Sequence, residues 1–148
     1  MRNLILFLHL AAAIFWMGGM AFTVLALRPV LHAALEPALR LPIMVRVLGR
    51  FFAVVAASIA VLLPSGLWMF SQSGMNATPP GWHAMATLGA LMMLVFGHIF
   101  FSPYRRLKLA VAALDWPEAG RRMGQITLLV KINLGLGWLA IAAVMLWR

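Results

Sequence analysis

The chain alternates between long apolar runs and shorter segments that hold almost all of its charged residues. Each run is long enough to cross the hydrocarbon core of a bilayer as a helix, which takes about 20 residues. The runs lack the polar face of a soluble amphipathic helix. The pattern therefore predicts an all-α integral membrane protein with spans at residues 4–27, 51–70, 84–101 and 126–147.

Prolines and glycines mark the connections between these spans. Pro29 ends the first span, Pro79-Pro80-Gly81 precedes the third, and Ser102-Pro103 closes it. The first run continues past the 7 to 15 residues of a signal-peptide core, so we interpret it as a retained span. A short connection between the second and third spans predicts antiparallel neighbours, and hence an up-down four-helix bundle. We expect one transmembrane domain over residues 1–148, without an internal repeat.

The distribution of positive charge predicts the topology. The chain carries 12 Lys+Arg and 3 Asp+Glu, for a net charge of +9. Because basic residues favour the cytoplasmic side, both termini are predicted outside, with Trp68, Trp82 and Trp147 at the outer interface. Because this positive charge lies between apolar runs, we expect it to contact anionic membrane lipid, and we do not expect the protein to bind nucleic acid. Nine basic residues fall in two segments predicted as cytoplasmic loops: Arg28, Arg40, Arg46, Arg50, Arg105, Arg106, Lys108, Arg121 and Arg122.

Composition excludes several kinds of chemistry. The chain is 64% hydrophobic, has a mean hydropathy of +0.97 and contains no cysteine, so any soft-metal site must use Met and His. It carries no phosphate-binding glycine loop, HExxH zinc motif or nucleophile elbow. Glu36, Asp115 and Glu118 all lie between spans, which excludes a carboxylate pair inside the membrane. We expect a protein that is not an enzyme; the enzymatic alternative is a haem-dependent membrane oxidoreductase.

Ionisable side chains inside a span are costly and are functional candidates by default. His9, His98 and Lys131 lie inside spans, and His83 lies at the outer edge of the third. His98 and Lys131 share a depth near the cytoplasmic side and are expected to meet, unless Lys131 extends to the surface.

A stripe on the first helix combines imidazole, indole and thioether groups. At 100° per residue, Trp16 and Met20 project close to the direction of His9. Imidazole and thioether form the ligand set that favours Cu(I), which makes His9, Met17, Met20 and His83 candidate copper ligands. The alternatives are methionines that only fill the core and a neutral imidazole bonded to a neighbouring helix. A haem bound between His9 and His83 is a further alternative.

Several motifs resemble the copper-resistance D (CopD) family of bacterial inner-membrane proteins. They are Leu8-His9-Leu10, Ile14-Phe15-Trp16-Met17-Gly18-Gly19-Met20 with Leu27-Arg28-Pro29, Arg50-Phe51-Phe52, Ser65-Gly66-Leu67-Trp68, Gly97-His98, Pro103-Tyr104-Arg105-Arg106-Leu107 and Asp115-Trp116-Pro117. The resemblance implies a short, stand-alone member that handles copper in the bacterial inner membrane, with periplasmic termini and periplasmic copper proteins as partners. His9 and its Trp16-Met17-Gly18-Gly19 neighbourhood are the matched site.

The first helix also resembles that of HemJ-type oxidases, which are membrane bundles that bind haem b. This resemblance implies His9 with His83 or His98 as axial ligands, and Lys131 as a partner of a haem propionate or a quinone. We therefore expect a copper ion or haem b as cofactor, with an electron-transfer partner in the second case. An accessory subunit without cofactor is the third hypothesis, and a homo-oligomer is left open.

Overall fold

The computed structural model describes residues 1–73 and 78–147, and these residues are almost entirely helical. Arg148, predicted on the outer side, lies outside the described residues. The π-helical η1 joins α1 and α2 without a break, so these three form one rod. The elements are α1 (Arg2–Phe22), η1 (Thr23–Leu27), α2 (Arg28–Ala34), α3 (Pro37–Ser73), α4 (Pro80–Phe101), α5 (Pro103–Ala112) and α6 (Trp116–Leu146).

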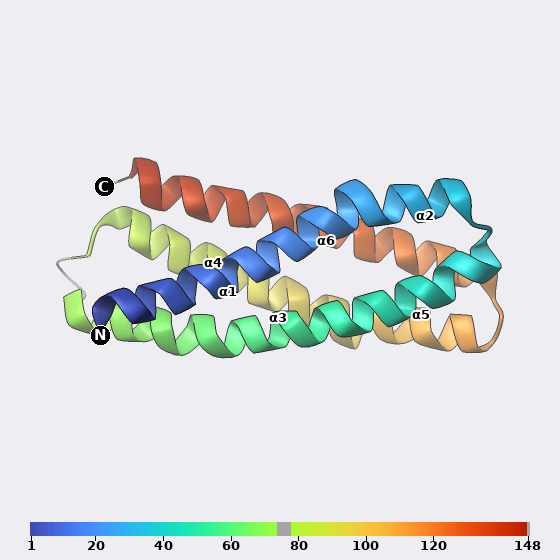
Figure 1. Cartoon of the computed structure of the whole chain (residues 1–148), viewed down its shortest axis with the longest axis horizontal. Helices are drawn as coiled ribbons and strands as arrows, with labels where there is room; N and C mark the ends of the chain where they lie inside the picture. Colours follow the sequence, from blue (N-terminus) through green and yellow to red (C-terminus); the bar gives the residue numbers. More distant parts are fainter. Residues whose placement is uncertain (74–77, 148) are drawn as a thin grey trace.

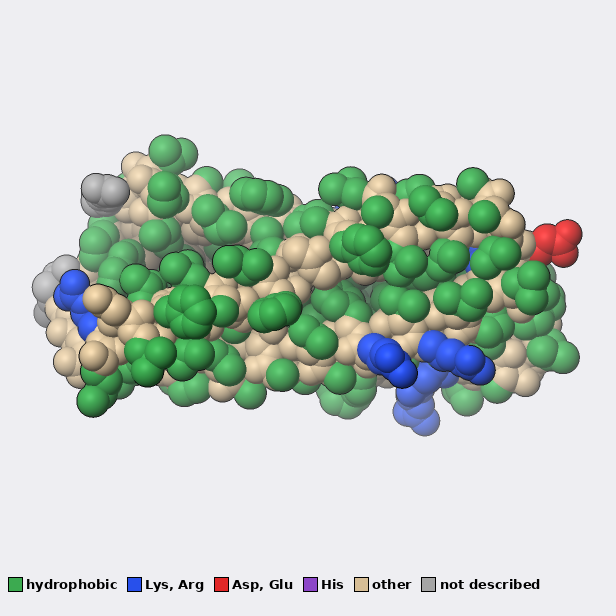
Figure 2. All heavy atoms as spheres, viewed as in Figure 1, with side chains coloured by type: hydrophobic (Ala, Val, Ile, Leu, Met, Phe, Trp, Pro, Cys, Tyr) green, Lys and Arg blue, Asp and Glu red, His purple; other side chains and the backbone are tan. Residues whose placement is uncertain are grey.

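Within the described residues, four helical segments are long and apolar enough to cross a membrane: Arg2–Ala34, Pro37–Ser73, Pro80–Ala112 and Trp116–Leu146. Hydrophobic side chains cover most of the face seen in Figure 2, while most of the visible Lys and Arg side chains gather in one half of it. Large apolar residues such as Leu94 and Trp138 are 71% and 63% exposed. Since water would disfavour such a surface, the chain is a multi-pass membrane protein.

The helices run up and down as an elongated bundle, as predicted (Figure 1). Following the predicted topology, we call the end where α1 begins and α3 ends the outer end. The end that holds the α2–α3 and α5–α6 connections is called the basic end. The most extensive packing joins α1 to α3 and α4 to α6, while α5 covers α6 near the basic end. The bundle therefore consists of two tightly packed helix pairs.

The segments predicted as loops are largely helical, so the loop prediction was wrong, while their cytoplasmic side stays a prediction. The long helix α3 begins at Pro37 and already buries Leu41, Met44 and Leu48 before the second span. Their spacing of three and four residues is that of one helix face, and it continues into the membrane part. Four basic residues of this region lie on exposed helix faces: Arg46, Arg50, Arg105 and Arg106.

Local signals end each helix where the chain turns. Ser102, the residue before Pro103, leaves the helical conformation with φ −113° and ψ −87°, as residues before proline tend to do. Leu114 has φ 57°, and Asp115 then caps α6 by accepting a hydrogen bond from the Glu118 N–H at 3.0 Å. This cap begins the full length of α6.

Two contacts close the ends of the bundle. At the outer end the Gly81 N–H donates to the Trp147 carbonyl at 3.0 Å, joining the start of α4 to the end of α6. Near the basic end the buried Tyr104 hydroxyl donates to the Val45 carbonyl at 3.1 Å, and its ring packs against Phe52 at 4.9 Å between centroids. The second contact fixes α5 on α3.

Candidate functional site

His9 lies about two turns into α1 and pairs with a serine on α3. Its Nδ1 is 2.8 Å from Oγ of Ser65, which is buried. The Ser65 hydroxyl has one hydrogen, and it is directed to the carbonyls of Val61 and Leu62 at 2.6 and 3.1 Å. Oγ therefore accepts from Nδ1–H, and we infer that Nε2 is the unprotonated nitrogen. This is the state in which an imidazole binds a metal ion.

The predicted stripe on α1 faces the interior, as expected. Trp16 and Met20 are only 3% and 1% exposed, and the Trp16 ring packs edge-on against Phe96 of α4 at 6.4 Å. His9 is half-buried. Eleven residues separate His9 from Met20, which is about 16 Å along the helix axis. These two side chains therefore occupy different depths in the bundle.

Two methionines from different helices meet at a glycine of α6. The Met17 sulfur lies where a β-carbon of Gly137 would be, and the Met92 methyl carbon Cε is 3.2 Å from that position. Gly137 is buried. The missing side chain thus makes room for thioethers from α1 and α4 in the middle of the bundle.

Asn133 lies one turn from Gly137 on the same face of α6. It is 2% exposed, and its Nδ2 donates to the Met92 carbonyl at 3.3 Å. Within residues 1–73 and 78–147 its Oδ1 has no hydrogen-bond partner. A buried amide oxygen without a partner is rare and costly. An uncompensated negative partial charge therefore lies one helical turn from the glycine at which the two methionines meet.

Thr127, another buried polar residue of α6, forms a different kind of hydrogen bond from Asn133. The Thr127 hydroxyl donates to Met123 within its own helix at 2.8 Å, whereas Asn133 forms the contact between helices. Of these two residues, only Asn133 therefore joins α6 to another helix by a side-chain hydrogen bond in the described part of the chain.

His83 lies near the start of α4, at the same end of the bundle as His9, and it is exposed. Its Nε2 is 2.6 Å from Oγ1 of Thr78, and its ring packs against Phe70 of α3 at 5.5 Å between centroids. Phe70 and Ser65 are five residues apart, about 7.5 Å along α3. The imidazoles of His9 and His83 thus both contact the outer part of α3.

His98 and Lys131 are exposed and are not joined by a hydrogen bond in the described part of the chain. His98 lines a shallow groove with Ser102, Arg106 and Arg122 at the α4–α5 junction. It is fifteen residues from His83, about 22 Å along α4. His83 shares the outer end with His9, whereas His98 lies toward the basic end, so the structure adds no support for the predicted His9–His98 haem pair.

Among the described residues, no group of three or more His, Asp or Glu could hold a metal ion. The candidate site therefore depends on thioethers with few imidazoles. The sequence interpretation did not identify Ser65 as the partner of His9 or Gly137 as the meeting point of methionines. The four-residue spacing of Asn133 and Gly137 could have indicated this part of the site. It places a side-chain amide and a position without a side chain on the same face of one helix.

The comparison with known families matches the model for copper resistance protein D, CopD, over residues 45–147. This range includes Ser65, Met92, Asn133 and Gly137, and it leaves His9 and Met17 on α1 outside. No curated protein and no solved structure matches the chain. Because the matched range covers more than half of the chain, this multi-pass protein belongs to the copper resistance protein D family.

Proposed function

We propose that the chain binds Cu(I) inside the bundle and receives it from the outer end. The observation that carries this proposal is the meeting of the Met17 and Met92 side chains at Gly137, inside a bundle of a copper-resistance family. Thioether sulfur is a soft ligand that selects Cu(I) over harder ions. Membership of the family makes copper the expected cargo, and the thioethers supply chemistry suited to it.

The geometry favours two successive positions for the ion. His9 and Met17 are eight residues apart, about 12 Å along α1, so they cannot bind one ion together. We assign the outer position to His9, whose Nε2 is available, with His83 nearby on the same end. Met17 and Met92 form the inner position, and Met20 lies one turn further inward.

Asn133 supports the inner position through electrostatics. Its carbonyl oxygen is a harder donor than sulfur and is not a preferred ligand of Cu(I). In the low dielectric of the bundle, however, its partial negative charge stabilises a nearby monovalent cation. We therefore assign Asn133 to stabilising the charge of the ion, and Met17 and Met92 to coordinating it.

The direction of uptake follows from the proposed topology. Nine basic residues near one end favour that end in the cytoplasm, which places His9 and His83 on the periplasmic side of a bacterial inner membrane. A periplasmic copper protein is then the donor. The described residues hold no carboxylate within the apolar part of the bundle, so transfer between soft ligands is the chemistry that the interior supports.

The test is a Cu(I) titration of detergent-purified protein against a competing chelator under reducing, oxygen-free conditions. The variant Met17→Leu/Met92→Leu should lose the inner ion, and His9→Ala should lose the outer one. Met145→Leu is the matched control, because Met145 is 64% exposed on α6. Unchanged stoichiometry in the double variant would overturn the proposal.

An absorption spectrum of the same preparation tests the haem alternative. Copper handling predicts no Soret band in protein purified from cells supplied with haem precursors. A Soret band that disappears in His9→Ala would assign His9 to haem b and contradict the outer copper position.

A further inference from the structure

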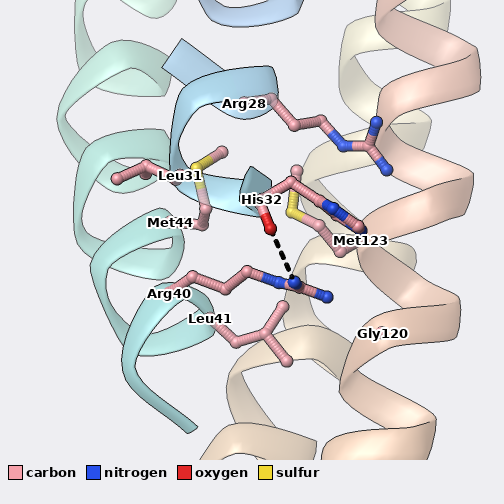
Figure 3. A pocket seen from close by; sticks show the side chains of 8 residues that line it. All are labelled: Arg28, Leu31, His32, Arg40, Leu41, Met44, Gly120 and Met123. Carbon is pink, nitrogen blue, oxygen red and sulfur yellow. Dashed lines mark hydrogen bonds between the residues drawn. The ribbon is translucent and has the colours of Figure 1, made fainter. Parts of the chain in front are cut away.

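A separate pocket lies at the basic end, between α2, α3 and α6 (Figure 3). Its cavity volume is about 100 Å³. That is too small for a large organic molecule and sufficient for a phosphate-sized group. Its lining consists of Arg28, Leu31, His32, Arg40, Leu41, Met44, Gly120 and Met123.

Positive charge dominates the polar part of this pocket. Figure 3 shows the Arg28 and Arg40 side chains on either side of His32, directed toward α6. Both arginines are half-buried. The Arg40 Nη1 reaches the carbonyls of His32 and Leu35 only at 3.5 Å, the limit of a hydrogen bond.

Among the described residues, no carboxylate neutralises either arginine. Within the described ranges, the ion pairs join Glu118 to Arg121 and Arg122. No carboxylate pairs with Arg28 or Arg40 in that part of the chain. Partly buried guanidinium groups without a counter-charge lose solvation, and a bound anion offsets that loss.

The other residues that line the pocket favour a small anionic headgroup over a metal ion. Leu41 and Met44 are each 2% exposed and form an apolar floor with Met123. The sulfurs of Met44 and Met123 are soft donors, yet two unpaired guanidinium groups in the same pocket repel a Cu(I) ion. Gly120 of α6 also lines the cavity, and a β-carbon there would meet no atom within 4 Å, so a larger side chain has room at this position.

The depth of the pocket corresponds to the headgroup layer. Arg28 lies 24 residues after Leu4, about 36 Å along the helical rod. That exceeds the roughly 30 Å of hydrocarbon and falls within the 40–45 Å that include the headgroups. Val30 and Leu39 are 63% and 61% exposed on the same two helices and offer apolar surface to acyl chains.

We propose that Arg28, His32 and Arg40 form a binding site for one phosphate group, carried by an anionic lipid or by free phosphate. Arginine suits this ligand because its planar fork donates two hydrogen bonds to phosphate oxygens. This site is distinct from the candidate copper ligands and does not depend on them.

The test uses the full chain in nanodiscs at physiological salt, where charges on the open surface are largely screened. Thermal unfolding is measured in phosphatidylcholine alone, with added phosphatidylglycerol, and with added inorganic phosphate. We expect the wild type to gain stability from phosphatidylglycerol, from inorganic phosphate, or from both. The arm that responds identifies the source of the phosphate group.

Two different variants should abolish this gain. Arg28→Gln/Arg40→Gln removes the charges and should weaken binding by about tenfold or more, since two charge-assisted contacts are lost. Gly120→Leu fills the cavity without changing charge, and so remains informative if the arginine variant fails to fold. The control Arg46→Gln/Arg105→Gln removes two exposed charges outside the pocket and should keep the gain.

Absence of stabilisation in both ligand arms would overturn the proposal. An equal loss in the control variant would also overturn it, because the effect would then be general attraction of anions to a basic surface.

Discussion

The sulfur atom of Met17 on α1 occupies the place where a β-carbon at position 137 of α6 would lie. Gly137→Ala should therefore displace the Met17 thioether. Since that group is the end of a flexible side chain, we expect a cost of about 1 kcal/mol in stability, at the low end of overpacking. Copper affinity should fall about tenfold if one of the two thioethers is misplaced. Chelator competition measures the affinity, and thermal unfolding measures the stability.

Gly135→Ala is the matched control for this substitution. A β-carbon at Gly135 would meet no atom within 4 Å, so the variant changes the same helix without touching Met17. Equal copper affinity in the two variants would count against the inner position.

Asn133 provides a test that separates binding from stability. Replacing it with leucine removes a buried oxygen whose missing partner costs about 1–3 kcal/mol, together with the hydrogen bond to Met92. We expect Asn133→Leu to be neutral or stabilising in thermal unfolding and to bind Cu(I) more weakly. Thr127→Val should leave copper affinity unchanged, because that hydroxyl bonds within its own helix. Strong destabilisation by Asn133→Leu would assign the residue to packing alone.

Tyr104 should stabilise the basic end of the bundle by two separable contributions. Tyr104→Phe removes the hydrogen bond to the Val45 carbonyl and should cost about 1 kcal/mol. Tyr104→Ala also removes the ring packed against Phe52 and should cost about 3–5 kcal/mol. Lys108→Met, which removes an ammonium 4.9 Å from the same ring, should cost less than about 1 kcal/mol. Denaturation in detergent compares the three, and equal losses for Phe and Ala would contradict the packing contribution.

The absence of cysteine makes the topology easy to measure. Single cysteines at Ser71 and Ala113 would be exposed at opposite ends of the bundle. With the basic end in the cytoplasm, a membrane-impermeant maleimide should label Ser71→Cys in intact cells and label Ala113→Cys only after lysis. The reverse labelling pattern would place His9 on the cytoplasmic side and exclude uptake of periplasmic copper through it.

The membrane class, the four helices and their up-down order could be predicted from the sequence. Long apolar runs separated by proline and glycine have few other solutions in a bilayer. The extra helical length at the basic end was missed because arginines between the runs suggested loops. The spacing of Leu41, Met44, Leu48 and Phe52 contained that signal, since one helix face continues through all four.

The candidate site was less predictable. The inward direction of Trp16 and Met20 follows from helical periodicity alone. The pairing of His9 with Ser65, and of Met17 with Gly137, depends on the relative depth and rotation of neighbouring helices. A single sequence does not specify those two quantities, because packing of many weak contacts sets them.

The two tightly packed helix pairs have a mechanical consequence. Met17 belongs to the α1–α3 pair, while Met92 and Gly137 belong to the α4–α6 pair, which the Gly81–Trp147 bond ties together at its tip. The thioethers thus lie at the interface between the two helix pairs, where the pairs would tilt relative to one another. A small hinge-like tilt between the pairs would separate the two thioether side chains, so binding of the proposed Cu(I) ion would depend on the relative orientation of the pairs.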